Sequence, residues 1–396
     1  MKVMAINAGS SSLKFKLFEM NNEEVIASGL FERIGIEDSF YTIKYNGESI
    51  KEEIELPDQV VTAKVLMDKL IALEIIKSMD EIKGISHRVV SGGEKYNDSV
   101  LITDEVIEVV EGLKDLAPLH IPASLKVIKA FKEVLPDTPM VAVFDTTFHQ
   151  TVEKKNYIYP VPYDWYEKYG VRKYGYHGTS YRYVASELEK ELGKKDYKAI
   201  VCHIGSGASI CAIKDGKSYD TSMGFSPASG IMMNTRAGDI DESIITYIME
   251  KEGKNAMEVM DDLNRISGFL GVSGISSDSR DVIKEMENGN ERCKLAVDIF
   301  TRRILAYISE YYVALEGVDA IVFTGGVGEN QISTRARIID KLSCLGIELD
   351  NSKNEVPNDG EYRKISSKDS TVTVYVIPTD EELVMARDAI RIAANR

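Results

Sequence analysis

Three turns rich in glycine and serine carry the residue types that bind phosphate. The first is Asn7–Ser12, followed by Lys14; the second is Gly205–Ser209, and the third is Phe323–Asn330. Small side chains let backbone N–H groups and hydroxyls approach an anion closely, and glycines before a helix add the favourable end of its dipole. The first turn alone is equally typical of an ordinary hairpin. Three such turns in one chain predict a long polyphosphate held by two similar halves, which indicates a nucleotide-dependent phosphotransferase.

Two common nucleotide-binding motifs are excluded by single residues. The run Gly216–Ser218 ends like a P-loop, but Cys211 stands where that motif needs its first glycine. The run Gly205–Gly207 begins like a dinucleotide-binding motif, but Ile210 stands at its third glycine. Both motifs are therefore rejected.

Histidine, arginine and carboxylate side chains fall at strand ends and turns, where they can take part in chemistry. All five histidines lie between positions 87 and 203. Arg88 lies near the end of a strand, and its guanidinium can hold a carboxylate or phosphate in a bidentate fork, although a surface ion pair fits it equally well. His120, Asp145 and His177 stand in loops or at a strand end. A lone histidine is more often structural than catalytic, but four such turns in one chain favour a site.

Three further segments combine cations and acids. The loop 221–241 joins small residues to Arg236 and two acids, and loops on a rigid scaffold often carry function. A second arginine–acid group occurs at Asp278–Arg280. Glu381 opens the last helix, where an acid either compensates the helix dipole or serves as a ligand for Mg²⁺, which prefers carboxylates and retained waters.

The composition is that of a soluble globular protein with room for two domains. The chain has 396 residues, 44% of them hydrophobic and 28% charged, with a formal net charge of −15. This charge argues against nucleic acid and anionic membranes as partners. No apolar run approaches the roughly 20 residues of a membrane span, and the first residues do not form a signal peptide. The four cysteines lack CxxC spacing, which predicts reduced thiols in the cytoplasm.

The elements that position these residues repeat in a similar order in the two halves. The first half has strands near 2–6, 13–18, 25–31 and 40–45, a helix over 62–78, a strand over 84–90, helices over 104–116 and 124–135, and a strand over 140–144. The second half has strands near 199–204, 208–213 and 218–222, helices over 241–252, 255–266 and 291–316, a strand over 320–324, a helix over 332–342, a strand over 371–377 and a final helix over 381–394. Such repeats predict an α/β fold with mixed sheets flanked by helices. We expect a domain boundary near 148–155 and a surface excursion over Asp350–Asp369.

Eight segments together resemble one protein family. They are Asn7–Lys14, His87–Val90, Leu116–His120, Phe144–His149, Gly175–Ser180, Met232–Asp241, Gly325–Asn330 and Pro378–Leu383. In this order and spacing they closely resemble acetate kinases of the acetokinase family, which also includes propionate kinases. The resemblance implies the duplicated actin-like ATPase fold of sugar kinases, Hsp70 and actin. With the expected boundary, residues 1–150 and the last helix, about 381–396, form an N-terminal domain, and residues 151–380 form a C-terminal nucleotide-binding domain.

The resemblance also implies an activity and a role for each matched residue. The activity is reversible transfer of the ATP γ-phosphoryl group to acetate, giving acetyl phosphate and ADP, by a cytoplasmic homodimer that uses Mg²⁺, or Mn²⁺ in its place. Arg88 would bind the substrate carboxylate, while His177 and Arg236 would stabilise charge on the transferring phosphoryl group. Asp145 matches an essential acid of the family.

The remaining matched positions fall into three groups. The metal positions are Asn7 and Glu381. The implied nucleotide contacts are Lys14, His203, Ile204, Gly205, Ser206, Gly207, Asp278, Ser279, Arg280, Gly326, Val327, Gly328, Glu329 and Asn330. The implied substrate pocket adds Val90, Leu119, His120, Tyr176 and Pro227 to Arg88.

Because a carboxylate is already ionised at neutral pH, the nucleophile needs alignment and charge neutralisation rather than a strong base. We therefore expect Asp145 to orient the substrate or a metal-bound water and not to remove a proton.

The chain departs from the family's usual residues at six positions. They are Ser91, Ile121, Tyr176, Tyr181, Ser206 and Asn234, which replace His, Asn, Phe, His, Asn and Gly respectively. Tyr176 adds a hydroxyl to the acyl pocket. Ser206 has a shorter side chain than asparagine to donate a hydrogen bond from a phosphate turn. Asn234 has a larger side chain than glycine and narrows the part of the nucleotide pocket expected to receive the adenosine. These changes keep open a kinase for propionate or another short-chain acid, and one that uses pyrophosphate instead of ATP. A simple ATP hydrolase also stays open, as does a nucleotide-binding scaffold, which the cationic substrate loops disfavour.

Overall fold

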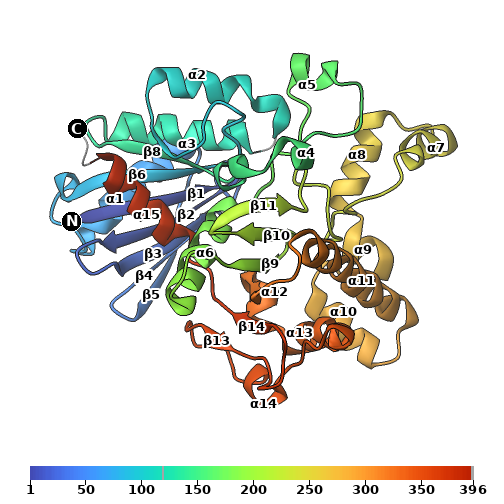
Figure 1. Ribbon diagram of the computed structural model, residues 1–396. Coiled ribbons are helices and arrows are strands. Elements are labelled where there is room, and N and C mark those ends of the chain that lie inside the picture. The colour runs from blue at the N-terminus through green and yellow to red at the C-terminus, as the bar shows by residue number, and fades with distance from the viewer. Residues whose placement is uncertain (118–119, 394–396) are drawn as a thin grey trace. The chain divides into compact units, whose positions relative to one another are not determined.

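The computed structural model describes residues 1–117 and 120–393, and these form two compact units. Unit 1 comprises Met1–Phe148 together with the segment that begins at Asp380, and unit 2 comprises His149–Thr379. Figure 1 shows the strands of unit 1 in blue and those of unit 2 in green and orange. Each unit is built around one twisted sheet, so the two are described in turn.

Unit 1 contains an eight-stranded mixed sheet in the order β5-β4-β3-β2-β1-β6-β8-β7. Its strands are β1 (Lys2–Ala8), β2 (Ser12–Glu19), β3 (Glu24–Glu32), β4 (Phe40–Tyr45), β5 (Glu48–Glu53), β6 (Ile82–Val89), β7 (Val100–Leu101) and β8 (Met140–Phe144). Its helices are α1 (Gln59–Ala72), α2 (Asp104–Gly112), α3 (Ile121–Val134) and α15 (Glu381–Ala393), with short 3₁₀ turns at Met79–Glu81 and Lys114–Leu116. The strands β1, β6 and β8 run parallel, so their carboxyl ends meet at one edge of the sheet.

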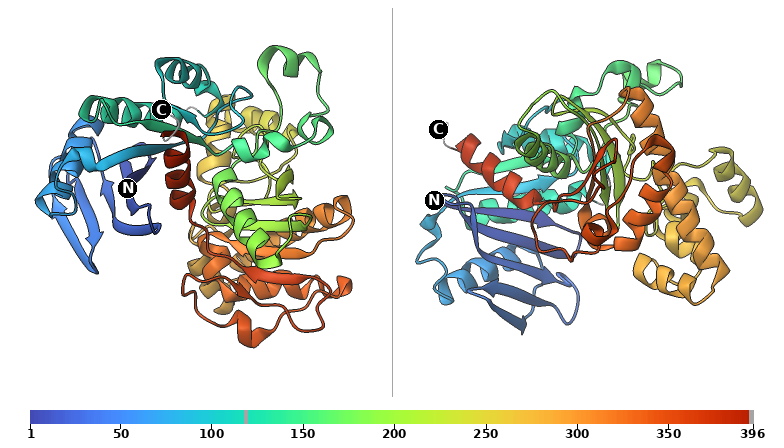
Figure 2. Two further views of the ribbon diagram at one scale, coloured as in Figure 1. Left: turned by 60° about the vertical axis from the view of Figure 1, so that its left-hand side comes forward. Right: turned by 60° about the horizontal axis from the view of Figure 1, so that its bottom comes forward.

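Apolar side chains explain why α15 returns to this sheet from the far end of the chain. Val3, Phe18 and Val141 of the strands pack with Met385 and Ala389 of the helix, and all five side chains are buried. Gly84 lies beneath the helix, and an added Cβ there would lie 3.7 Å from the Cβ of Ala389. Figures 1 and 2 show this helix in red, and it packs against the strands of unit 1. The helix therefore brings Glu381 to the unit that carries Arg88 and Asp145.

Unit 2 repeats the central pattern in a six-stranded sheet of order β11-β10-β9-β12-β14-β13. Its strands are β9 (Lys198–Ile204), β10 (Ala208–Lys214), β11 (Lys217–Thr221), β12 (Ala320–Thr324), β13 (Arg363–Lys364) and β14 (Thr373–Val376). Its helices are α4 (Lys154–Tyr157), α5 (Asp164–Tyr169), α6 (Gly178–Leu192), α7 (Ser243–Glu252), α8 (Ala256–Arg265), α9 (Gly268–Ser273), α10 (Ser279–Glu287), α11 (Glu291–Ala314), α12 (Gly325–Asn330), α13 (Ile332–Asp340) and α14 (Asn351–Asn354). The turns Thr147–Thr151 and Ser343–Leu345 are 3₁₀ helices.

The two sheets share one topology, which confirms the expected duplicated α/β fold. In unit 1 the order β3-β2-β1-β6-β8 has two antiparallel pairs followed by two parallel pairs. In unit 2 the order β11-β10-β9-β12-β14 has the same sequence of pairings. In both sheets the first two strands are joined by a glycine- and serine-rich turn, as the sequence predicts.

Some local expectations are wrong. The segment Asp350–Asp369 is mostly exposed, as expected, but Asn354 is buried and β13 pairs with β14 at the edge of the sheet. The predicted loop at 325–330 is itself the short helix α12. The strands β5 and β7 lie outside the predicted ranges, since each adds an edge to the sheet without a long apolar run.

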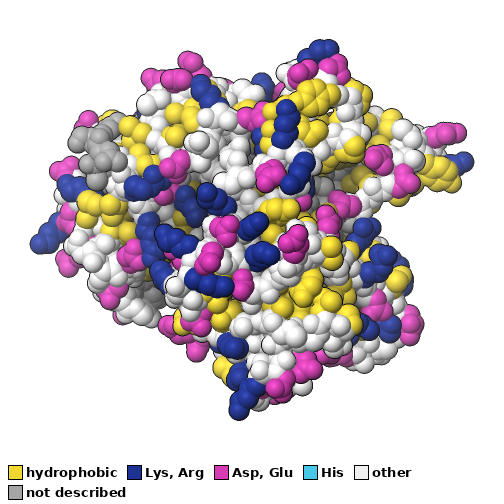
Figure 3. All heavy atoms as spheres, in the orientation of Figure 1, with side chains coloured by type: hydrophobic (Ala, Val, Ile, Leu, Met, Phe, Trp, Pro, Cys, Tyr) yellow, Lys and Arg dark blue, Asp and Glu magenta, His cyan; other side chains and the backbone are white. Residues whose placement is uncertain are grey.

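The described residues include no helix long and apolar enough to cross a membrane. Acidic and basic side chains are interspersed on the face shown in Figure 3. All four cysteines are free thiols, with Cys344 exposed and Cys202, Cys211 and Cys293 buried.

Candidate functional site

Arg88 and Asp145 form a bidentate ion pair at the carboxyl ends of two neighbouring parallel strands. Arg88 lies near the end of β6 and Asp145 directly follows β8. The Arg88 Nε atom lies 3.0 and 3.1 Å from the two carboxylate oxygens of Asp145, and Nη2 lies 2.7 Å from Oδ2. Asp145 is only 2% exposed, and its charge raises the pKa of Arg88. The carboxylate of Asp145 is thus used to orient the guanidinium.

Asn7 and Glu381 lie around the same guanidinium. The Nη1 atom of Arg88 is 3.5 Å from Oδ1 of Asn7, which directly follows the buried part of β1. Burial raises the pKa of Glu381 to about 7; Arg88 and Lys14 oppose the rise, while Asp145 and Glu382 add to it. Unit 1 therefore brings together an amide oxygen, a half-buried carboxylate and a clamped arginine.

Lys14 is held by an acid rather than left as an isolated cation. Its Nζ atom lies 2.5 Å from Oε1 of Glu382, and Lys16 contacts Asp380 and Glu382 at 2.9 and 3.2 Å. The expected role of Lys14 as a nucleotide contact stays a prediction. Among the substrate-pocket candidates of unit 1, Val90 is buried after β6 and His120 is exposed before α3. Leu119 lies outside the described residues.

In unit 2, a strained turn presents His177 at the start of α6. Gly175 has φ +75°, and an added Cβ would lie 2.6 Å from both His149 and Thr221, so only glycine fits. His177 itself has φ 57°, a left-handed conformation that costs energy for a residue other than glycine and recurs at functional sites. The Nδ1 atom of His177 lies 2.8 Å from Oγ of Ser209, and its ring stacks on His203 with centroids 4.2 Å apart.

His149 supports this turn from below. Its ring is buried, with Nδ1 2.8 Å from the Ser218 hydroxyl and Nε2 2.9 Å from the carbonyl oxygen of Tyr176. Burial lowers the pKa of His149 to about 4, so the ring is neutral at pH 7 and Nε2–H donates to the carbonyl. His149 is therefore a structural histidine, and it fixes the backbone of the candidate pocket residue Tyr176.

Arg236 converges with His177 over a glycine. The two guanidinium nitrogens Nη1 and Nη2 would lie 3.5 and 3.6 Å from a Cβ added at Gly207, and Nε2 of His177 would lie 3.6 Å from the same point. The Nη1 atom of Arg236 also donates to the carbonyl of Pro227 at 2.9 Å. Burial lowers the pKa of Arg236, whose guanidinium nevertheless stays charged at neutral pH. The absence of a side chain at Gly207 leaves room for a ligand oxygen between two donors.

The turn at Gly205–Gly207 is shaped by backbone hydrogen bonds. The N–H of Gly205 donates to the carbonyl of Gly207 at 3.2 Å, and the N–H of Asn234 donates to the carbonyl of Ser206 at 3.3 Å. Ser206 is exposed, whereas His203 and Ile204 are buried at the end of β9. The two unusual residues Ser206 and Asn234 are thus in direct backbone contact, on the surface expected to receive the nucleotide.

The two remaining nucleotide segments meet each other. Asp278 caps α10 and also pairs with the exposed guanidinium of Arg280. Ser279 is buried, and its hydroxyl accepts a hydrogen bond of 2.5 Å from Gln331, directly after α12. Asn330 donates to the carbonyl of Gly326 at 2.9 Å, so its amide is used inside α12. The structure therefore joins the 278–280 and 326–330 segments into one surface of unit 2.

Two charged side chains hold α12 in place. Glu329 accepts hydrogen bonds through Oε1 from the N–H groups of Gly325 and Thr379, at 2.9 and 3.1 Å. Arg335 is fully buried, and its Nη1 donates to the carbonyls of Gly328 and Glu329, both at 2.9 Å. The carboxylate of Glu329 thus serves the protein backbone. The sequence does not single out Arg335, because an arginine in an amphipathic helix carries no local signal of burial.

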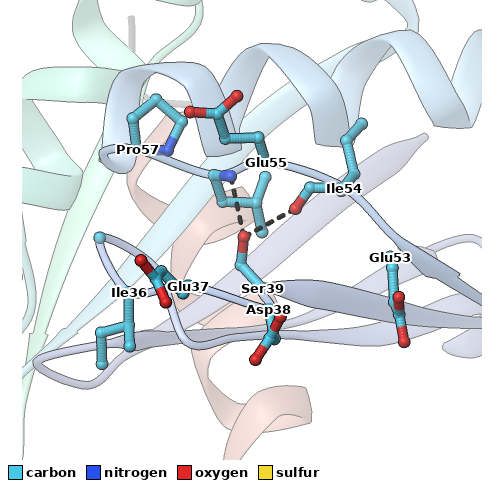
Figure 4. A pocket seen from close by; sticks show the side chains of 10 residues that line it. Ile36, Glu37, Asp38, Ser39, Glu53, Ile54, Glu55 and Pro57 are labelled. Atoms are coloured by element: carbon cyan, nitrogen blue, oxygen red, sulfur yellow. Dashed lines mark hydrogen bonds between the residues drawn. The ribbon is translucent and has the colours of Figure 1, made fainter.

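A large surface hollow in unit 1 does not contain any of these residues. It is lined by Gly35–Ser39 and Glu53–Pro57, and Figure 4 shows the Ser39 hydroxyl between the Ile54 carbonyl and a backbone N–H. Its side chains include four acids and no cation, so an anionic substrate would be repelled. The hollow is therefore a feature of the loop packing and not the candidate site.

The comparisons with known proteins all point to one family. The family model of the acetokinase family matches residues 2–387. The acetate kinase of Bacillus subtilis (strain 168) is 53% identical over 394 residues, covering 99% of each chain. The crystal structure of Porphyromonas gingivalis acetate kinase is 45% identical with a TM-score of 0.93, and that of a propionate kinase from Francisella tularensis is 38% identical with a TM-score of 0.93; each comparison covers 99% of both chains. The matched motifs, the duplicated sheets and these similarities together show that the chain belongs to the acetokinase family.

Proposed function

We propose that the protein is an acetate kinase, which transfers the γ-phosphoryl group of ATP to acetate and forms acetyl phosphate and ADP. The observation that carries this proposal is that each unit holds an arginine in a position where it can bind an anionic oxygen. Arg88 is fixed by Asp145 in unit 1, and Arg236 converges with His177 over Gly207 in unit 2. A nucleotide-binding scaffold has no use for a clamped arginine beside a small apolar residue such as Val90.

Arg88 binds the carboxylate of acetate and holds it for attack. The acid is ionised at neutral pH, so one oxygen is already a nucleophile and no side chain has to remove a proton. Asp145 keeps the guanidinium in one orientation, which leaves Nη1 as the nitrogen that is not engaged by that carboxylate. Asp145 is therefore a positioning residue for Arg88, a narrower role than orienting the substrate or a metal-bound water.

His177 and Arg236 stabilise the phosphoryl group during transfer. In a loose transition state the negative charge is spread over the three equatorial oxygens, so fixed donors and positive charge lower the barrier. The N–H of His177 and the guanidinium of Arg236 meet at the space above Gly207. The γ-phosphoryl group of ATP occupies that space in the proposed complex.

The residues of unit 1 fit a magnesium ion. Asn7 and Glu381 supply the oxygen ligands that Mg²⁺ prefers. Burial raises the pKa of Glu381, and a bound cation would lower it again and keep the carboxylate ionised. The described residues contain no group of three or more histidine, cysteine or acidic side chains that could hold a metal, which suits an ion that keeps waters and binds substrate phosphates. When bound, the ion neutralises charge on the phosphates. Mn²⁺ is proposed as its substitute.

The nucleotide binds the surface made by the 203–207 turn, the start of α10 and α12 in this proposal. Glycines at 205, 207, 326 and 328 let backbone N–H groups approach the phosphates. Ser279 and Gln331 join α10 to α12, so the surface is formed before the nucleotide arrives. We also propose that the protein is a cytoplasmic homodimer and that unit 1 and unit 2 are the two domains of each subunit, as the resemblance implies.

The acyl pocket decides between acetate and a longer acid. Tyr176 is buried, and its hydroxyl donates to the carbonyl of Phe225 at 2.9 Å, so the extra oxygen is used within the protein. Among the other apolar candidates for this pocket, Pro227 belongs to unit 2 and Val90 to unit 1. The second candidate is a propionate kinase, favoured by the similarity to the Francisella tularensis structure.

The test is acyl-hydroxamate formation by the purified protein with Mg²⁺. Acetate, propionate and butyrate are each combined with ATP, GTP and pyrophosphate. The proposal predicts the highest kcat/KM with acetate and ATP. A preference for propionate would transfer the function to the second candidate, and a signal with pyrophosphate alone would make Ser206 and Asn234 the determinants of a different donor. Product in no combination would overturn the proposed function.

A further inference from the structure

Beneath His177, two hydroxyl groups form a buried chain with the imidazole. Tyr181 lies one turn along α6 from His177, and Ser209 lies on β10. The Ser209 hydroxyl is 2.8 Å from Nδ1 of His177 and 2.5 Å from the Tyr181 hydroxyl. Tyr181 and Ser209 are both fully buried. The proposed reaction assigns no role to these two side chains.

The direction of the hydrogen bonds in this chain follows from the donors available. A serine hydroxyl carries one proton, so Ser209 donates either to His177 or to Tyr181, but not to both. Burial raises the pKa of Tyr181 well above its ordinary value, so the phenol keeps its proton. The Tyr181 hydroxyl lies 2.5 Å from the Ser209 hydroxyl, so it can donate its proton to Ser209 and leave the Ser209 proton for Nδ1 of His177.

We propose that Tyr181 and Ser209 are positioning residues that hold neutral His177 with its proton on Nε2. Tyr181 donates to Ser209, Ser209 donates to Nδ1, and Nε2–H then points to the space above Gly207, where Arg236 also lies. The role of this N–H as a donor to the transferring phosphoryl group rests on the proposed function. The opposite tautomer would place a lone pair there and repel the phosphoryl oxygens.

The rigid surroundings make this choice of tautomer matter. His177 sits in a left-handed backbone conformation and its ring stacks on His203, so the ring does not turn freely to exchange its two nitrogens. The hydrogen-bond partner of Nδ1 therefore decides which chemical group Nε2 presents.

The direct test is a long-range ¹H–¹⁵N correlation spectrum of the full-length protein with labelled histidine, with the signals of His177 assigned from His177→Asn. We expect Nε2 to be protonated and Nδ1 to be an acceptor in the wild type. We expect Tyr181→Phe and Ser209→Ala to give a mixture of tautomers, and Ser209→Thr to restore the wild-type spectrum. A wild-type His177 with its proton on Nδ1 would overturn the inference.

Kinetics provide the second readout. Because a preorganised donor acts mainly in the transition state, we expect Tyr181→Phe and Ser209→Ala to lower kcat by ~10-fold or more, with less than about 3-fold change in either KM. Tyr197→Phe is the matched control, since that buried hydroxyl donates to Ala185 of the same helix and touches neither histidine. Equal kcat values for Tyr181→Phe and Tyr197→Phe would overturn the inference. If the wild type makes no acetyl phosphate but shows the expected tautomer, the proposed function is wrong and the inference about the tautomer of His177 is not.

Discussion

At the scale of single residues, the Arg88–Asp145 pair carries the account of substrate binding. Asp145 is buried and uses both oxygens on one guanidinium, so its charge has a defined structural purpose. We expect Asp145→Asn to lower kcat/KM for acetate by ~100-fold, because removing one partner of a buried ion pair leaves the other uncompensated. Steady-state kinetics check this, with the circular dichroism spectrum as a control for folding. Near-normal turnover of the variant would show that Arg88 needs no such support.

His149 gives a pH dependence of stability. Burial depresses the folded-state pKa of His149 from 6.5 to about 4, so its contribution is complete above the unfolded pKa and is lost as the pH falls toward the folded one. Compared with His149→Gln, the wild type is expected to lose roughly 2–3 kcal/mol of its free energy of unfolding between pH 6.5 and pH 4. Urea denaturation at a series of pH values measures the difference. Parallel curves for the two proteins would contradict the neutral, buried state of His149.

At the scale of elements, α12 depends on side chains from outside its own turn. Four of its six residues are glycine or β-branched, and neither type favours a helix. Arg335 from α13 donates to its last carbonyls and to Asn354, and burial lowers the pKa of this arginine to about 10, so it stays charged at neutral pH. The helix is therefore held by its neighbours and not by propensity.

Replacing this arginine should weaken nucleotide binding more than acid binding. Arg335→Met keeps much of the volume but leaves buried carbonyls without donors, so we expect a loss of about 2–4 kcal/mol in the free energy of unfolding. We expect KM for ATP to rise ~10-fold while KM for acetate changes little, because α12 belongs to the proposed nucleotide surface. Arg337→Met, on the same helix, is the control. Equal KM values for ATP in the two variants would contradict the role given to Arg335.

The same elements show what the sequence alone can predict. Apolar runs flanked by turn residues place β8 and β12 at 140–144 and 320–324, and alternation of apolar and polar residues places β4 at 40–45, because such strands have a strong local pattern. The edge strand Glu48–Glu53 has one apolar residue among six, so its pairing with β4 gives no such pattern. Candidate residues that belong to family motifs can be found from the sequence, but Ser209 and Arg335 act through contacts 32 and 19 residues apart in sequence. Such contacts follow from the topology and not from local spacing.

At the scale of the whole molecule, the nucleotide candidates other than Lys14 lie in unit 2, which also holds the only tryptophan, Trp165. A ligand that binds the folded state stabilises it in proportion to the logarithm of its concentration. With Mg²⁺ and ADP at ~100 times the dissociation constant, we expect the unfolding transition reported by Trp165 fluorescence to gain about 2.7 kcal/mol. An unchanged transition at concentrations that saturate the reaction would place the nucleotide elsewhere.

The central claim is that both units serve one reaction, the phosphorylation of a carboxylate. Phosphorus NMR of the protein with ATP, Mg²⁺ and acetate tests it most directly, because acetyl phosphate, ADP and free phosphate give separate signals. The account predicts acetyl phosphate and ADP in equal amounts, with ~100-fold or greater loss of both in Arg88→Ala and in His177→Ala. Release of free phosphate at the same rate with and without acetate would contradict it, since that is the behaviour of an ATP hydrolase.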